Sequence, residues 1–309
     1  MLSQLTPECP TYLLHKAQAL PAMTTAVVNA GSVLALESAQ LAHKAGIIVP
    51  VLVGDPLLIN KSAHALGWDI AEFELVPAAD EADAAAKAVA CVHQGTAQLL
   101  MKGDLHTDVL IRALLNRDTG LRTGERLSHL FHMTVPNSDR VLCITDAVVN
   151  VQPDTKTQLS ILRGATSVMH ALGNDNPRIA LLSATEVPSE AMPSSLCAKD
   201  ILAAMSPQDH AAARVFGPLA FDGAVSPEAA KIKGIENPVA GHADVLLVPN
   251  IETGNAIFKQ LVYFNAATAA GVLLGAKVPV MLTSRADPPA ARLASAALAV
   301  VYAHHLHAG

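Results

Sequence analysis

Aromatic and charged residues are scarce in this sequence, which limits the kinds of core and of partner it can have. Aromatics make up 3% and charged residues 16% of its 309 residues, against 51% hydrophobic residues. Alanine and branched aliphatic side chains must therefore fill the core, as in parallel sheets covered by alanine-rich helices. The formal net charge of −6 argues against nucleic acid as a partner, because that partner requires a broad basic face.

Cysteine is also rare, and no segment has the character of a membrane anchor or a leader. The cysteines form no CxxC pair, which indicates neither a zinc site nor a disulfide framework and favours a reducing cytoplasm. Residues 13–21 are too short for a signal peptide and carry His15 and Lys16, and no apolar run reaches the ~18 residues of a membrane span. We expect a soluble, cytoplasmic protein without a membrane partner. The four cysteines are Cys9, Cys91, Cys143 and Cys197.

Several well-known site motifs are missing. No GxGxxG opens a helix, no HExxH occurs, and the stretch from Gly271 to Lys277 misses the spacing of a phosphate-binding P-loop. The acidic residues do not cluster at metal-ligand spacing. The sequence therefore predicts neither a dinucleotide site, nor a P-loop, nor a dedicated metal site.

From Met23 onward, strand-like and helix-like segments alternate, with short breaks at glycine or proline. This rhythm is typical of repeated βα units and a mainly parallel sheet, so we predict an α/β fold. The length favours two domains. Near the carboxyl terminus we predict a helix at Asn255–Ala270, strands at Gly271–Leu274 and Val278–Leu282, and a closing helix at Pro289–His305.

The stretch PVMLTSRAD, residues 279–287, is the strongest local candidate for a site. An apolar strand ends there in Thr283, Ser284, Arg285 and Asp287. Polar residues just past the carboxyl end of a strand lie at the edge where α/β sheets bind ligands. An ordinary loop with a helix cap and a surface ion pair would account for the same nine residues.

Four further polar clusters also follow aliphatic strands, and the carboxyl ends of parallel strands meet at one edge of a sheet. For each residue taken singly, a structural role explains its position as simply as ligand binding does. Asp146 and Asn255 suit helix caps, Lys259 a solvated helix face, and Arg112 a surface partner of Asp108. The candidate binding residues are Lys102, Thr107, Arg112, Asp146, Asn250, Asn255 and Lys259.

From about Met101 to the carboxyl terminus, several distinctive strings occur in a fixed order. They are MKGDLHTD, LSH, ITDAVVNVQPD, RIALLSATE with AMPSS, GPLAFDGAVSPEAAKIKG, ADVLLVPNIETGNAIFKQLVYF and PVMLTSRAD. In these strings and their order the sequence resembles the family of phosphate acetyltransferases and phosphate butyryltransferases. The first hundred residues share only the βα rhythm with that family.

The resemblance implies a two-domain, three-layer α/β/α fold with mainly parallel sheets and an active site in the cleft between the domains. It also implies transfer of a short acyl group, acetyl or butyryl, between coenzyme A and inorganic phosphate, by a homodimer that needs no metal. Bound anions call for guanidinium, hydroxyl and amide donors, and the coenzyme A thiol calls for a carboxylate base. In these roles Ser284, Arg285 and Asp287 are the catalytic candidates.

One position departs from the acetyltransferase pattern. That branch has an acidic residue, treated as the base, a few residues after its Ser-Arg pair, where Ala291 stands here. The Ser-Arg-Ala-Asp string is more similar to the butyryltransferase branch, in which Asp287 could hold Arg285 in place. Two alternatives stay open: a catalytically silent coenzyme A-binding or scaffold protein, and an enzyme that takes acyl groups from a carrier protein. We expect residues 1–138 with 283–309 to form one domain and residues 139–282 the other.

Overall fold

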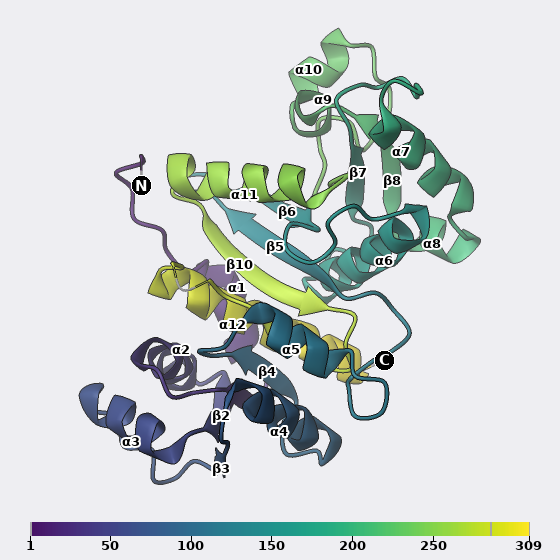
Figure 1. Ribbon diagram of the computed structural model, residues 1–309. Helices are drawn as coiled ribbons and strands as arrows, with labels where there is room; N and C mark the ends of the chain where they lie inside the picture. The colour runs from purple at the N-terminus through teal and green to yellow at the C-terminus, as the bar shows by residue number, and fades with distance from the viewer. Residues whose placement is uncertain (1, 285, 309) are drawn as a thin grey trace. The chain divides into compact units, whose positions relative to one another are not determined.

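Helices alternate with mainly parallel strands along the chain, as Figure 1 shows for the computed structural model, which describes residues 2–284 and 286–308. The predicted α/β fold is therefore confirmed. The chain forms two compact units: unit 1 comprises Met1–Thr6 and Arg126–Ala269, and unit 2 comprises Pro7–Glu125 and Ala270–Gly309. Our domain assignment, with junctions after residues 138 and 282, stays a prediction.

The strands of unit 2 follow the order β3-β2-β1-β4-β11-β10. All neighbouring pairs are parallel except β10 with β11. The chain proceeds from β1 to β2 and β3 on one side, whereas β4 lies on the other side of β1. The carboxyl ends of β1 and β4 therefore flank a point where the winding direction reverses, the usual place for a ligand in such a sheet. These strands are β1 (Met23–Val28), β2 (Ile48–Gly54), β3 (Leu75–Pro77), β4 (Leu99–Lys102), β10 (Thr268–Leu274) and β11 (Val280–Met281).

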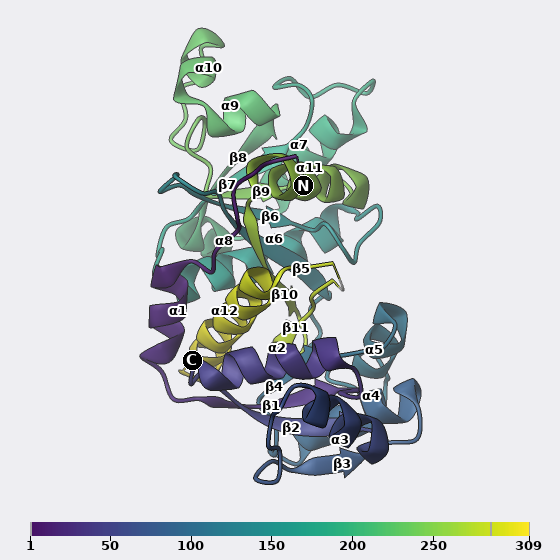
Figure 2. The same cartoon turned by 90° about the vertical axis from the view of Figure 1, so that its left-hand side faces the viewer.

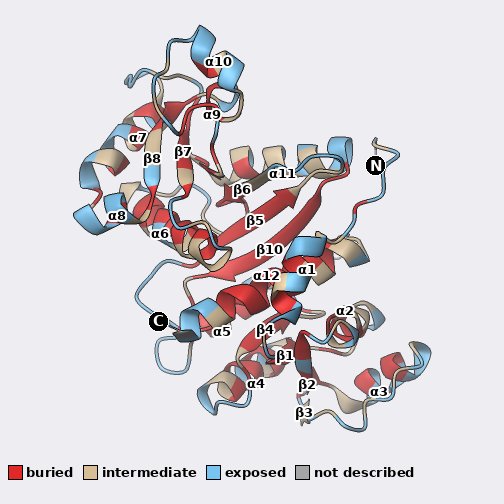
Figure 3. Ribbon diagram, turned by 180° about the vertical axis from the view of Figure 1, so that it is seen from behind, coloured by how far each residue is buried: buried red, intermediate tan, exposed pale blue. Residues whose placement is uncertain are grey.

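The carboxyl-terminal helix α12 (Pro289–Ala308) packs against the helices at the start of unit 2, α1 and α2 (Figure 2). Its alanines are buried along most of its length (Figure 3), because small side chains let helix and sheet approach closely. Ser295 on this helix accepts a hydrogen bond from the backbone N–H of Gly271 at 2.9 Å. The other helices of unit 2 are α1 (Thr11–Gln18), α2 (Val33–Lys44), α3 (Pro56–Ala65), α4 (Glu81–His93) and α5 (Thr107–Leu114).

Unit 1 contains a second sheet segment in the order β5-β6-β9-β7-β8, in which only β5 and β6 are antiparallel. Helix α11 lies over β5 and β6, where the rings of Phe131 and Phe258 stack at 4.2 Å. The strands are β5 (Ser128–Thr134), β6 (Val141–Thr145), β7 (Arg178–Leu182), β8 (Arg214–Leu219) and β9 (Val245–Leu247). The helices are α6 (Thr155–Ala171), α7 (Pro193–Ala204), α8 (Pro207–Ala212), α9 (Phe221–Val225), α10 (Pro227–Ile232) and α11 (Ile251–Asn265).

The predicted helix at Asn255–Ala270 is wrong at both ends. Asn250 caps α11 by accepting the backbone N–H of Thr253 at 2.9 Å, so the helix begins at Ile251. Ala266 adopts a left-handed conformation, with φ 52°, and the next residues form the fully buried strand β10. A short alanine-rich apolar run fits a buried strand as well as a helix, and here burial decides for the strand.

Helices α1, α8 and α9 have eight residues or fewer. Short segments of this kind show little helical periodicity. Within the described residues, no helix combines the length and the hydropathy that crossing a membrane requires.

Candidate functional site

A cavity of about 190 Å³ lies in unit 2, at the point where the winding of its sheet reverses. The cavity is lined by the amino end of α2, by the end of β4 and the residues after it, by residues after β11, and by a single side chain of α12. Sequence segments far apart in the chain therefore converge here. The lining residues are Ser32, Leu34, Ala35, Ser38, Lys102, Gly103, Asp104, Thr283, Ser284 and Arg292.

The loops that follow β1 and β4 are fixed to each other by backbone hydrogen bonds. The N–H of Gly103 donates to Val28 O and that of Asp104 to Asn29 O, both at 2.9 Å. The Asn29 side-chain amide donates in turn to the carbonyl of Asp104. Asn29 itself has φ 56°, a conformation that asparagine tolerates better than most residues. A Cβ at Gly103 would lie 2.4 Å from Val28 O, so only glycine allows this close approach.

Ser284 and Asp287 form a turn after β11. The Asp287 carboxylate accepts the backbone N–H of Ser284 at 2.6 Å, and the N–H of Asp287 donates to Ser284 O at 3.1 Å. Burial raises the pKa of the Asp287 carboxyl, while the Ser284 N–H and the positive charge of Arg292 act in the opposite direction. Arg285, between them in sequence, lies outside the described residues.

Arg292 was not predicted, and it is the most deeply buried charged side chain that lines this cavity. Its side chain is 4% exposed and donates through Nη2 to the carboxylate of Glu37 on α2. Its Nε is buried and has no hydrogen-bond partner among the described residues. The sequence does hold one signal: Arg292 is the only Lys, Arg, Asp or Glu between Pro288 and the carboxyl terminus.

The remaining candidates of unit 2 lie on α5 or at the end of β4. Lys102 ends β4 and lines the cavity. Thr107 is the first residue of α5. Arg112 pairs with Asp108 at 3.1 Å, and their side chains are 77% and 70% exposed. This is the surface pair that the spacing also allowed, so a substrate role for Arg112 stays a prediction.

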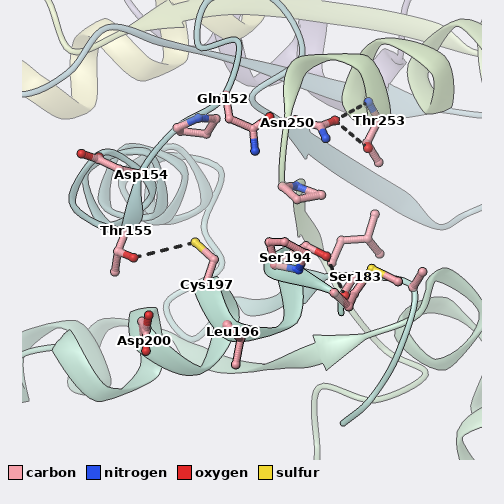
Figure 4. A pocket seen from close by; sticks show the side chains of 16 residues that line it. Gln152, Asp154, Thr155, Ser183, Ser194, Leu196, Cys197, Asp200, Asn250 and Thr253 are labelled. Atoms are coloured by element: carbon pink, nitrogen blue, oxygen red, sulfur yellow. Dashed lines mark hydrogen bonds between the residues drawn. The ribbon is translucent and has the colours of Figure 1, made fainter. Parts of the chain in front are cut away.

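Unit 1 has its own cavity, of about 710 Å³, at the amino ends of α6, α7 and α11 (Figure 4). Asn250 lines it while capping α11, and Ser183 and Ser194 form a hydroxyl pair at 2.9 Å. Cys197 lies 3.9 Å from the hydroxyl of Thr155. Burial raises the pKa of the Cys197 thiol, which favours the protonated form and argues against a nucleophilic thiolate.

Asp146 is buried, with 2% exposure, and its carboxylate accepts three backbone N–H groups and the side-chain amide of Asn150. Burial raises the pKa of Asp146 and these hydrogen bonds act in the opposite direction. Asn255 donates to Ala147 O at 3.4 Å, and Lys259 is exposed on α11. The substrate roles of all three residues stay predictions.

The structure thus brings Lys102 and Ser284 to one cavity of unit 2, and it places Asn250 at the cavity of unit 1. Asn255 lies near Asp146 through its hydrogen bond to the carbonyl of Ala147, the next residue in the chain. Across residues 2–284 and 286–308, no group of three or more His, Cys, Asp or Glu side chains could hold a metal ion.

Comparisons with known proteins agree along nearly the whole chain. The model of the "Phosphate acetyl/butaryl transferase" family matches residues 79–300. A phosphate acetyltransferase of Rhizobium meliloti is 42% identical over 94% of this chain and 92% of its own. A phosphate butyryltransferase of Clostridium acetobutylicum is 39% identical over 94% of this chain and 97% of its own. The crystal structure of a branched-chain phosphotransacylase from Enterococcus faecalis V583 superimposes with a TM-score of 0.78, at 33% identity over 92% of this chain and 99% of its own. The chain is a member of the phosphate acetyl- and butyryltransferase family.

Proposed function

We propose that the protein transfers a short acyl group between coenzyme A and inorganic phosphate: acyl-CoA and phosphate give acyl phosphate and coenzyme A. The observation that carries this proposal is the similarity to phosphate acetyltransferases and butyryltransferases at about 40% identity over 94% of the chain. The two identities, 42% and 39%, are too close to choose the acyl chain.

The chemistry sets three requirements for the residues. Phosphate must be held against the electrophilic carbonyl of acyl-CoA, the thiol of coenzyme A must lose its proton when it attacks acyl phosphate in the reverse direction, and the oxyanion that forms in either direction needs a hydrogen-bond donor. In the forward direction a phosphate oxygen bonds to the acyl carbon, the carbon–sulfur bond breaks, and the thiolate leaves with the electron pair. Each well-placed donor to the oxyanion contributes about 3 kcal/mol.

Residues of unit 2 suit the phosphate side of this reaction. Lys102 and the hydroxyl of Ser284 line one cavity, which supports them as donors to an anion. We assign Arg285 the bidentate contact with phosphate that a planar guanidinium provides. Asp287 is the nearest carboxylate to this pair in sequence, and a raised pKa brings it closer to the range useful for proton transfer.

The cavity of unit 1 supports a role in binding part of acyl-CoA. Its volume of about 710 Å³ falls in the range of about 300–1,000 Å³ that is usual for small-molecule sites. Asn250 offers an amide at its edge. We retain Thr107, Arg112, Asp146, Asn255 and Lys259 as candidate binding residues, each to be tested by substitution.

The test is release of free thiol from acetyl-, propionyl- and butyryl-CoA in the presence of phosphate, with chloride at equal ionic strength as the control. We expect thiol release that depends on phosphate, and the specificity constants then rank the acyl chains. No release with any of the three would contradict the proposal.

That negative result would favour a catalytically silent binding protein, for which Ala291 at the position of the acidic residue is the specific support. Release from an acylated carrier protein in place of acyl-CoA would favour the carrier-dependent enzyme. Activity that survives a chelating agent would support a reaction without metal. The homodimer and the cytoplasmic location are likewise proposals, and a monomer at micromolar concentration in sedimentation would contradict the dimer.

A further inference from the structure

The cavity of unit 2 contains a buried arginine whose hydrogen-bonding capacity is only partly used. Arg292 donates to Glu37 through Nη2, and its Nε has no partner among the described residues although the side chain is 4% exposed. Burial of a guanidinium N–H without an acceptor is costly, so such a group in a cavity wall calls for an acceptor that enters the cavity.

The surroundings of Arg292 favour an anionic acceptor. Two cationic side chains, Lys102 and Arg292, and one anionic side chain, Asp104, line the cavity. Glu37 and Asp287 also interact with Arg292. The attraction for an anion therefore rests on Lys102, on the unused Nε of Arg292 and on the amino end of α2. Ser32 caps α2, a helix of 12 residues, and its hydroxyl accepts only one of the first backbone N–H groups. The others in that turn have no partner within the helix and attract negative charge.

The size of the cavity restricts the kind of anion. Its volume of about 190 Å³ is below the range of about 300–1,000 Å³ that larger ligands occupy. A tetrahedral phosphate fits such a space with a few water molecules, since each water takes about 30 Å³. The nucleotide part of coenzyme A is too large for it.

We propose that Arg292, together with Lys102 and the amino end of α2, binds the phosphoryl group that inorganic phosphate and acyl phosphate share. Arg292 is then a phosphate-binding residue in addition to Ser284 and Arg285. This inference rests on the proposed function for the identity of the ligand, whereas the site itself is defined by the residues of unit 2.

The first experiment measures binding of inorganic phosphate to the full chain by calorimetry, at constant ionic strength. Arg292→Gln should weaken phosphate binding by about 10-fold to 100-fold, the loss expected for hydrogen bonds to a charged group. The matched control is Arg163→Gln, which breaks an arginine–carboxylate pair in unit 1, with Asp209 at 2.8 Å. Unchanged phosphate affinity in folded Arg292→Gln overturns the proposal.

A second variant tests the site without removing a buried group. Ser38 lies on α2 and lines the cavity, so Ser38→Asp places a carboxylate beside the bound phosphate. We expect phosphate binding to weaken at least 10-fold by charge repulsion. Ser138→Asp, on an exposed loop of unit 1, is the control. Equal affinities in the two variants overturn the proposal even if Arg292→Gln does not fold.

Adenosine 3′,5′-bisphosphate, which carries phosphate groups like those of coenzyme A, identifies the source of the ligand. The proposal expects Arg292→Gln to lower affinity for inorganic phosphate and leave that for the bisphosphate unchanged. The reverse result assigns the site to coenzyme A and overturns the proposal. Loss of phosphate binding in Arg292→Gln, with no acyl transfer by the wild type, contradicts the proposed function but leaves the site. Normal phosphate binding by Arg292→Gln, together with acyl transfer by the wild type, contradicts the proposed site but supports the proposed function.

Discussion

Replacement of Asp146 separates a structural role from a role in substrate binding. Its Oδ1 accepts N–H groups from Val148 at 2.8 Å and Val149 at 3.1 Å. Its Oδ2 accepts the backbone N–H of Asn150 at 3.1 Å and the Asn150 amide at 2.6 Å. Asp146→Ala removes both carboxylate oxygens, and with them all four hydrogen bonds, from a residue that is 2% exposed.

The expected loss of stability follows from these contacts. A buried donor left without an acceptor costs about 1–3 kcal/mol, and the substitution leaves four such donors. Part of this total cost is offset because the turn can relax and because a desolvated carboxyl is no longer buried. We expect Asp146→Ala to lower the free energy of unfolding by about 3–5 kcal/mol. Asp146→Asn keeps one oxygen and should lose about 2 kcal/mol. In a unit of about 150 residues the alanine variant should melt about 6–20 °C lower.

The assay is urea unfolding with the Michaelis constants measured on the same preparations. Asp175→Asn, an exposed carboxylate in unit 1, is the control and should stay within about 0.5 kcal/mol of the wild type. A normal urea midpoint in Asp146→Ala, with a raised Michaelis constant for either substrate, would refute this reasoning and make Asp146 a ligand-binding residue.

Three further predictions concern Gly103, His132 and Arg285. Gly103→Ala places a Cβ 2.4 Å from Val28 O and 2.7 Å from Asn29 O, so we expect a loss of about 1–3 kcal/mol and a higher Michaelis constant for phosphate; a neutral effect on both would mean that the loops yield easily. Complete burial lowers the pKa of His132 from 6.5 to about 4, so its contribution to stability is present above pH 6.5 and is lost as the pH falls toward 4. Urea unfolding of the wild type should show about 2 kcal/mol of this loss at pH 5, and an equal loss in His132→Gln would assign it to other groups. Arg285→Lys should keep the melting temperature and lose acyl transfer, because lysine lacks the planar fork; near-normal turnover would make PVMLTSRAD an ordinary loop.

The sequence was sufficient for the α/β fold because its periodicity is local. Helix α4, Glu81–His93, is an alanine-rich segment of this kind, and the side chain of Asp80 caps it. Helix α11 was misplaced because Asn250 was interpreted as a ligand while its side chain caps the helix, and because the alanines after Asn265 are compatible with both helix and strand. The local sequence pattern cannot distinguish helix from strand for such a segment, because the outcome depends on its burial in the folded protein.

The site was predicted only in part, for a related reason. Lys102 ends the aliphatic strand β4 and Ser284 lies shortly after the aliphatic strand β11, and that pattern can be recognised in the sequence alone. Arg292 differs, because its partner Glu37 is 255 residues away and its burial depends on how α12 packs. The left-handed backbone of Asn29 is likewise imposed by contacts with the loop after β4. Long-range contacts of this kind have no local signature.

Unit 1 interrupts unit 2 in the chain, and this has a consequence for synthesis on the ribosome. Every segment of unit 1 emerges before β11 and α12, which complete unit 2. Lys102 precedes Ser284 by 284 − 102 = 182 residues, which takes roughly 10 to 40 s at about 5–20 residues per second. During that interval the amino-terminal strands of unit 2 have an unpaired edge at β4, so the nascent chain can form non-native strand pairs at this edge until β11 has been made.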